Sequence, residues 1–264
     1  YFGVGGNIVI PDSVTSIGKS AFEGCSGLAS VTIDNSVTSI EDFAFYGCSG
    51  LADVQGFVII RGVLYDYFGE DGNIDIPDSV TSIGNYAFRD CSCLTSVTIG
   101  NGVTSIASSA FLGCDNLIDT TTIKGIELVD GWIVGYTDNC PSSLNLTGVR
   151  GIADFAFSGC SGLTSVTIPD SVMSIGDQAF SGCSGLRTVK YLGDAPISDG
   201  NIYGTGALIN VVSYVTEGSL GWKYPNSEQL PVKWNGCPIF YMPTTVSGTI
   251  SALLSTLLAL KTDQ

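Results

Sequence analysis

The sequence contains no histidine, and basic residues are scarce. Ten Lys and Arg stand against 25 Asp and Glu, which gives a formal net charge of −15, and only 13% of the residues are charged. Without histidine, the Ser-His triad, the usual general base and most histidine-ligated metal sites are excluded. An acidic chain also lacks the basic patch that binds nucleic acid or an anionic membrane. We therefore expect no nucleic-acid partner, no metal and no cofactor.

Long apolar runs are also missing. The most apolar stretch, residues 251–260, is far shorter than the about 20 residues that a membrane-spanning helix needs. We therefore expect no membrane insertion. Residues 243–264 are interpreted as a tail that can form a short helix.

The chain does contain an eight-residue phrase that occurs six times. It reads Ala-Phe-Glu-Gly-Cys-Ser-Gly-Leu at residues 21–28, and its phenylalanines are spaced 23, 43, 23, 46 and 23 residues apart. They are Phe22, Phe45, Phe88, Phe111, Phe157 and Phe180. A fixed period of about 20 to 30 residues is typical of a solenoid, in which each repeat is one coil stacked on its neighbours. We therefore predict one elongated repeat domain.

Each coil has the same internal pattern. An alternation such as residues 28–33 predicts a half-buried strand, and a turn of Pro, Asp, Asn or Gly follows it. A Val-Thr-Ser-Ile segment such as residues 14–17 comes next, and the Ala-Phe element closes the coil with a large apolar side chain. Stacked coils would place like side chains on one another and pair their strands about 4.8 Å apart in a parallel sheet.

The two longer intervals each contain one atypical coil. Residues 57–65 and 126–134 are β-rich runs around an Arg-Gly or Asp-Gly pair, which predicts a β-hairpin in each. The opening residues 1–3 also match residues 67–69, so a super-repeat of about 66 residues begins partway through. This offset predicts that the sequence belongs to a longer array.

The repeated pattern, which residues 156–176 carry almost completely, resembles the BspA-like leucine-rich repeats over residues 1–195. The resemblance implies a mostly β solenoid with a parallel sheet on one face. It also implies an extracellular or cell-surface protein that acts in adhesion, and it brings no catalytic motif. Residues 196–242 are similar to segments that close such arrays, so we interpret them as a C-terminal cap.

Nine cysteines, an odd number, cannot all pair within one chain. Six of them hold the same place in successive coils and are interpreted as a ladder of reduced, buried thiols. Those six are Cys25, Cys48, Cys91, Cys114, Cys160 and Cys183. Zinc is the alternative, but the ladder lacks a paired Cys-x-x-Cys spacing. Cys140 and Cys237 lie outside the ladder and are the candidates for oxidation or a disulfide.

Exposed strand positions supply the first candidate binding surface. Most are Ser and Thr, which a solvated strand face needs for solubility, and a few positions break the pattern. A hydroxyl-rich face can also bind protein or glycan through many weak hydrogen bonds. The candidate ligand-binding residues there are Asp53, Gln55, Thr98, Thr167 and Lys190.

Aromatic residues of the two hairpins supply a second candidate. They could form a protruding hot spot, or they could fill the core of the atypical coils. They are Tyr65, Tyr67, Trp132 and Tyr136.

These observations predict a non-enzymatic, monomeric binding or adhesion module whose partner is a protein, with a glycan as a further possibility. A structural spacer that projects another domain is the alternative. Identical Ser and Thr pairs in three coils favour the spacer there, and the irregular positions favour binding. An enzyme would need two carboxylates facing each other across a cleft, and no such pair can be placed from the sequence.

Overall fold

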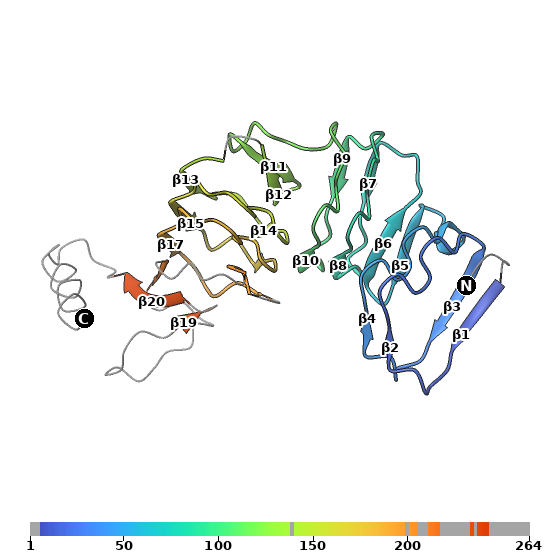
Figure 1. Ribbon diagram of the computed structural model, residues 1–264. Helices are drawn as coiled ribbons and strands as arrows, with labels where there is room; N and C mark the ends of the chain where they lie inside the picture. The colour runs from blue at the N-terminus through green and yellow to red at the C-terminus, as the bar shows by residue number, and fades with distance from the viewer. Residues whose placement is uncertain are drawn as a thin grey trace, which may run out of the picture.

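The computed structural model describes residues 6–137, 140–198, 201–204, 211–216, 233–234 and 237–242. The chain is a mostly β solenoid of about nine turns (Figure 1). A single 3-10 turn, η1 (Ser49–Leu51), is the one helical element in this part of the chain. The predicted fold class is confirmed.

The strands form two rows, one on each side of the solenoid. Figure 1 shows the coils along an arc, with longer strands on its outer side and two-residue strands on its inner side. The outer row comprises β1 (Gly6–Ile10), β3 (Leu28–Ile33), β7 (Asn73–Asp75), β9 (Ser96–Thr98), β13 (Ser143–Asn145), β15 (Ser165–Ile168) and β17 (Thr188–Tyr191). The inner row comprises β2 (Ser16–Ile17), β4 (Ser39–Ile40), β8 (Ser82–Ile83), β10 (Ser105–Ile106), β14 (Gly151–Ile152) and β16 (Ser174–Ile175).

Successive coils stack in register, so equivalent residues pair. Val166 of β15 lies beside Val189 of β17, and Ile152 of β14 lies beside Ile175 of β16. These apolar residues are buried, at 1% exposure or less, and belong to the larger of the two core clusters. A single coil could not bury them, because each coil covers only its neighbours.

The repeated phenylalanines form an aromatic column inside the solenoid. Phe157 stacks on Phe180 with ring centroids 5.2 Å apart, and Phe88 stacks on Phe111 at 5.1 Å. In the first atypical coil Tyr65 contacts Phe45 at 5.5 Å and so continues the column. Aromatic pairs at these separations stabilise the stack beyond their buried area.

The cysteine ladder follows the same stacking. Each of three thiols donates a hydrogen bond of 2.9–3.1 Å to the carbonyl of the phenylalanine in the preceding coil. These thiols belong to Cys48, Cys114 and Cys183, and burial raises the pKa of each, to about 11, 11 and 12 respectively. High thiol pKa values keep them protonated and unreactive, as the interpretation of a reduced ladder requires.

One ladder cysteine departs from that interpretation. Cys160 forms a disulfide with Cys140 of the preceding coil, and their Cα atoms lie 5.7 Å apart. The prediction of a reduced thiol at Cys160 is therefore wrong, whereas oxidation of Cys140 is confirmed. The two cysteines are 20 residues apart, whereas ladder cysteines of adjacent regular coils are 23 residues apart. The side chain of Cys237 lies outside the described residues.

Both predicted hairpins are present. Strands β5 (Phe57–Ile60) and β6 (Val63–Tyr67) pair antiparallel, as do β11 (Ile126–Val129) and β12 (Trp132–Tyr136). Their turns are Arg61-Gly62 and Asp130-Gly131, and all four residues have positive φ, the backbone that a tight hairpin turn requires. Strand β6 then pairs in parallel with β8, and β12 with β14. Each hairpin thus supplies the inner strand of its coil.

The second hairpin is fixed at its tip by a charged contact. The Arg150 guanidinium donates to the Asp130 carboxylate at 2.7 Å and to the Ile99 carbonyl at 3.1 Å. The backbone N–H of Ile99 donates to the same carboxylate at 2.8 Å. Asp130 and Arg150 therefore join the hairpin to the coils on both sides of it.

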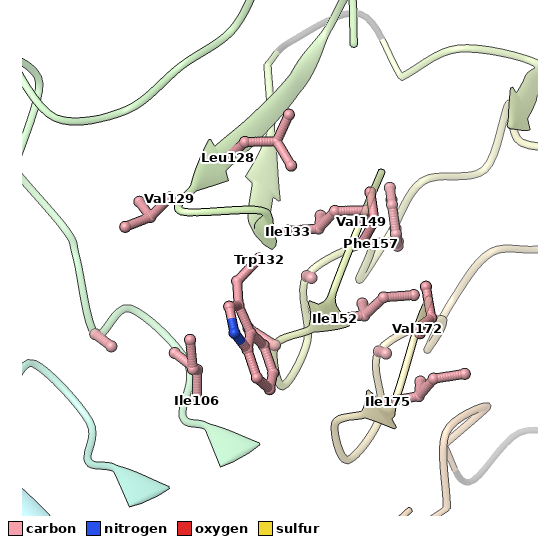
Figure 2. Packing of buried hydrophobic residues seen from close by; sticks show 14 of the residues in the cluster. Ile106, Leu128, Val129, Trp132, Ile133, Val149, Ile152, Phe157, Val172 and Ile175 are labelled. Atoms are coloured by element: carbon pink, nitrogen blue, oxygen red, sulfur yellow. The ribbon is translucent and has the colours of Figure 1, made fainter. Parts of the chain in front are cut away.

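Trp132 fills the junction between the two inner sheets. Figure 2 shows its indole pointing from the start of β12 toward Ile106 of β10, near Ile152 of β14. The side chain is 2% exposed, and it lies against the backbone of Gly151 so closely that a Cβ there would collide with the ring. Gly151 stands where most coils have Ser, because Trp132 occupies the space that a serine side chain needs.

At the C-terminal side, β18 (Val212–Thr216) pairs with β17, and β20 (Cys237–Met242) pairs with β18, both in parallel. Strand β19 (Lys233–Trp234) pairs antiparallel with β20. These strands extend the outer sheet. Residues 196–198 and 201–204 of the predicted cap are also described, and Ile202 and Tyr203 are buried. The tail 243–264 and the remaining parts of the cap lie outside the described residues. Within the described ranges no helix is long and apolar enough to cross a membrane.

Candidate binding surface

The outer strand face brings some of the predicted residues together. Thr167 pairs with Lys190, which in turn pairs with Tyr214, so the three form a row across β15, β17 and β18. Thr98 is exposed too, but it pairs with Asp75 in the separate sheet of β7 and β9. The predicted strand-face residues therefore lie on two sheets and do not form one surface.

Hydroxyl groups on the coil surfaces mostly contact the neighbouring coil. Ser165 bonds to Ser143 at 2.9 Å, Ser30 to Asn7 at 2.8 Å, and Ser105 to Ser82 at 2.9 Å. These rows of hydroxyl groups show how the polar groups of a surface with few charges find hydrogen-bond partners. They also use hydrogen-bonding capacity that a ligand would otherwise need.

Asp53 and Gln55 do not lie on the strand face. They belong to the turn between η1 and β5, where the Asp53 carboxylate accepts the backbone N–H of Gln55 at 2.9 Å and of Phe57 at 3.0 Å. Their predicted position in the outer sheet is therefore wrong, because the hairpin coil replaces the regular strand with this turn. Both residues are exposed.

Three of the four hairpin aromatics are core residues. Tyr65, Tyr67 and Trp132 are 5%, 4% and 2% exposed. A protruding hot spot is therefore wrong for these three, and the alternative, that they fill the core of the atypical coils, is confirmed. Tyr136 is half-buried, and its hydroxyl donates to the carbonyl of Ser158 at 3.0 Å.

A different set of residues forms a ridge along the inner side of the arc. In each of the six phrases, the residue before Ala-Phe has a φ between 51° and 60°, the left-handed region that side chains rarely adopt. We call these six residues the bend ridge. They are Ser20, Phe43, Tyr86, Ser109, Phe155 and Gln178.

The bend ridge varies where the core repeats. Its residues are two Ser, two Phe, one Tyr and one Gln, and each adopts a conformation that costs about 1 kcal/mol or more for a residue other than Gly. The Phe155 side chain is 39% exposed despite its size. Phe43 and Tyr86 contact each other with ring centroids 5.6 Å apart. The left-handed backbone thus recurs in every phrase, whereas the side chain at this position varies, and of its three aromatic residues Phe155 is exposed while Phe43 and Tyr86 are half-buried.

Two adjacent hollows lie beside the bend ridge. The first, of about 350 Å³, is lined by residues from coils as far apart as Glu41 and Asp177, and the second has a volume of about 340 Å³. They share Ala107, Ser108, Asp154 and Phe155 as walls and are therefore adjacent, and we call the two together the groove. The curvature of the arc gathers these distant coils around a common space.

The lining of this groove is acidic. Six carboxylates line it, and no lysine or arginine is found among the described residues of its walls. They are Glu41, Asp42, Asp115, Glu127, Asp154 and Asp177. Some are held by local hydrogen bonds, such as Asp154, which accepts the backbone N–H of Asp177 at 2.8 Å. The groove therefore concentrates part of the net negative charge next to the exposed ring of Phe155.

Glu127 is the carboxylate with the most unusual surroundings. It lies on β11 opposite Gly135, and a Cβ at Gly135 would collide with the Glu127 carboxylate. In the first hairpin the arrangement is reversed, because Val58 lies opposite the buried Asp66. Burial, and next the nearby Asp115, raise the pKa of Glu127 above its ordinary value. The second hairpin thus carries its acidic group on the side that faces the groove.

This environment predicts a pH-dependent effect of replacing Glu127 by glutamine. Because its pKa is raised by folding, the charged form lowers the stability of the native state at neutral pH. Below the ordinary glutamate pKa of about 4.5 the side chain is protonated in both states and the penalty disappears. Glu127→Gln should therefore raise the free energy of unfolding at pH 7 and leave it unchanged near pH 3.5. Urea unfolding at both pH values measures this, and a loss of stability at pH 7 would contradict it.

Sequence reasoning missed the bend ridge and the groove. The available signal was the position before Ala-Phe, which varies among Ser, Phe, Tyr and Gln while the phrase after it repeats. From the sequence, an apolar residue two positions before a buried phenylalanine suggests another core residue. The left-handed backbone that directs this side chain away from the core cannot be recognised in the sequence.

Comparison with known proteins agrees with this architecture. The model for the BspA type leucine-rich repeat region matches the chain in six copies, over residues 6–56 and 64–187, which is more than half of its length. The chain belongs to the BspA-type leucine-rich repeat family. This family consists of repeat proteins and is not known for enzymes. No curated protein matches the chain.

Several solved structures contain similar repeats. A leucine-rich cell surface protein of Faecalibacterium prausnitzii is 27% identical, and the match covers 70% of this BspA-type chain and 59% of that protein, with a TM-score of 0.30. The pneumococcal vaccine antigen PcpA is 18% identical over 80% of this chain and 63% of its own, with a TM-score of 0.29. A leucine-rich repeat protein of Bacteroides ovatus is 20% identical over 90% and 84%, with a TM-score of 0.25. The chain thus spans less than two thirds of the first two proteins.

Proposed function

We propose that this BspA-type chain is a non-enzymatic module, secreted or displayed at the cell surface, that binds a protein partner through the groove on its inner side. The observation that carries the proposal is the bend ridge. Its side chains differ from coil to coil, and Phe43 and Phe155 line the groove, whereas the core residues repeat. An exposed aromatic residue such as Phe155, beside a groove and outside the core, is typical of a binding hot spot.

A role as a spacer is the second candidate. It is favoured by the Ser and Thr ladders of the outer face, which pair coil with coil and are interchangeable between copies. The two roles are compatible with different surfaces, since the outer face can be inert while the inner groove binds. We therefore assign the spacer role to the outer face alone.

A binding screen tests the proposal. The chain is passed over immobilised extracellular-matrix proteins and a glycan panel, at several salt concentrations. Saturable binding to a protein would support the module, and its loss at high salt would indicate a charged contact. Absence of saturable binding to any protein of the panel would favour the spacer, and saturable binding to glycans alone would replace the protein partner with a carbohydrate.

A further inference from the structure

The second hollow of the groove has the chemistry of a receptor for a basic side chain. We propose that the hollow between Asp115, Glu127, Tyr136 and Phe155 receives a lysine or arginine side chain of the protein partner. This inference rests on the proposed function and names the chemistry of the partner at that site.

The walls of the hollow suit both parts of such a side chain. Tyr136 and Phe155 offer aromatic surface, and Ala107 adds an apolar wall, whereas Asp115 and Glu127 place carboxylates in the same space of about 340 Å³. Lysine and arginine bury their aliphatic stems against apolar surface and keep the charged end beside acceptors. A guanidinium or ammonium group bonded to carboxylates forms the stronger, charge-assisted kind of hydrogen bond.

The chain shows the same contact elsewhere on the bend ridge. The Lys19 ammonium lies 5.6 Å from the ring centre of Phe43, and the Arg89 guanidinium lies 5.3 Å from that of Tyr86. Phe155 is the third aromatic of the ridge, and the described residues place no cation over it. A cation over an aromatic ring is stabilised by the charge distribution of the ring. A basic side chain of the partner would complete at Phe155 what the chain provides for itself at the other two positions.

Internal cations do not supply this charge within the described residues. Arg150 is paired with Asp130 at 2.7 Å and Arg89 with Asp90 at 3.2 Å, and these are the ion pairs found there. Neither Asp115 nor Glu127 takes part in them. The raised pKa of Glu127 has the same origin, because the carboxylate is partly removed from water and lies near another negative charge. A bound cation would offset both the burial of the Glu127 carboxylate and its repulsion by Asp115. The hollow therefore favours a basic side chain of the partner over an uncharged or acidic one.

Titration with single amino-acid amides tests the inference without knowledge of the partner. Isotope-labelled chain is titrated with N-acetyl-lysine amide, N-acetyl-arginine amide and the uncharged N-acetyl-norleucine amide, and the amide signals of Gly135, Tyr136 and Phe155 are followed. We expect saturable shifts with the two basic probes and none with norleucine. Shifts that are equal for all three probes, or shifts that do not saturate, would overturn the proposal.

Paired variants separate the hollow from the general charge of the chain. The double variant Asp115→Asn/Glu127→Gln removes the two carboxylates of the hollow, and Asp12→Asn/Asp75→Asn removes two exposed carboxylates outside the groove lining. We expect at least a tenfold loss of affinity for the basic probes in the first variant and less than a twofold loss in the second. Equal losses of affinity in both variants would mean that the probes are attracted by the overall negative charge, and this result would overturn the proposed site.

The same variants distinguish this inference from the proposed function. A partner found by the screen that binds Asp115→Asn/Glu127→Gln as tightly as the unaltered chain would refute the basic contact and leave the binding module standing. A screen that finds no partner, together with saturable lysine binding at the hollow, would refute the module and leave the hollow as a cation-binding pocket.

Discussion

Replacing Phe157 by alanine is expected to lower the free energy of unfolding by about 3–5 kcal/mol. The Phe157 ring is fully buried and stacks on Phe180, 5.2 Å away and nearly parallel at 3°. Its removal leaves a cavity in the aromatic column and uncovers one face of the Phe180 ring. Each coil is stabilised mainly by its neighbours, so a loss at this position weakens the contacts on both sides of the coil.

The control for this variant is two residues away. Phe155 carries the same side chain in the same coil but is 39% exposed, so Phe155→Ala should change the free energy of unfolding by less than about 1 kcal/mol. Denaturant unfolding followed by far-UV circular dichroism measures both variants. Equal effects at the two positions would contradict the assignment of Phe157 to the core and of Phe155 to the groove.

Restoring the repeat pattern at Gly151 is expected to destabilise the protein. Most coils have Ser at this position, yet Gly151→Ser should lower the free energy of unfolding by about 1–3 kcal/mol through overpacking. The cause is Trp132, whose ring occupies the place of a Cβ at Gly151. In the first hairpin the equivalent pair is Val63 beside Ser82, where the smaller side chain leaves room for serine. The chain therefore contains both combinations that fit.

A double-mutant cycle tests the coupling between these positions. Trp132→Val alone should destabilise by leaving a cavity, and Gly151→Ser alone by collision. Trp132→Val combined with Gly151→Ser recreates the pair of the first hairpin and should be less destabilised than the sum of the single variants, by about 0.5–3 kcal/mol. Additive effects would show that the two residues act independently, contrary to the close approach of the Trp132 ring to Gly151.

Repetition made most of the fold predictable. The six phrases locate the buried phenylalanines, and the Arg-Gly and Asp-Gly pairs locate both hairpins, because these features depend on contacts that recur at fixed spacing. The disulfide of Cys160 was not predictable, since Cys140 lies outside the repeated phrase and its position depends on the atypical coil that holds it. The spacing of the repeated phrases does not determine where Cys140 lies.

The candidate site was much less predictable than the fold. Glu41 and Asp177 belong to distant coils, and they line one hollow because the arc curves toward its inner side. Curvature is the sum of small rotations between coils, which no single repeat encodes. Asp53 was misplaced for a related reason, because a turn replaces the regular strand where the hairpin begins.

The central claim is that the varying residues of the bend ridge bind and the outer strand face does not. The most direct test compares two sets of variants, each built from residues that other coils already use at the same position. Phe43→Ser/Phe155→Ser copies Ser20 and Ser109, and Thr167→Asn/Lys190→Thr copies Asn145 and Thr167 and keeps the outer face polar. The affinity for the partner found by the screen should fall at least tenfold in the first set and less than twofold in the second. An unchanged affinity in the first set with a loss in the second would place binding on the outer face and contradict the account.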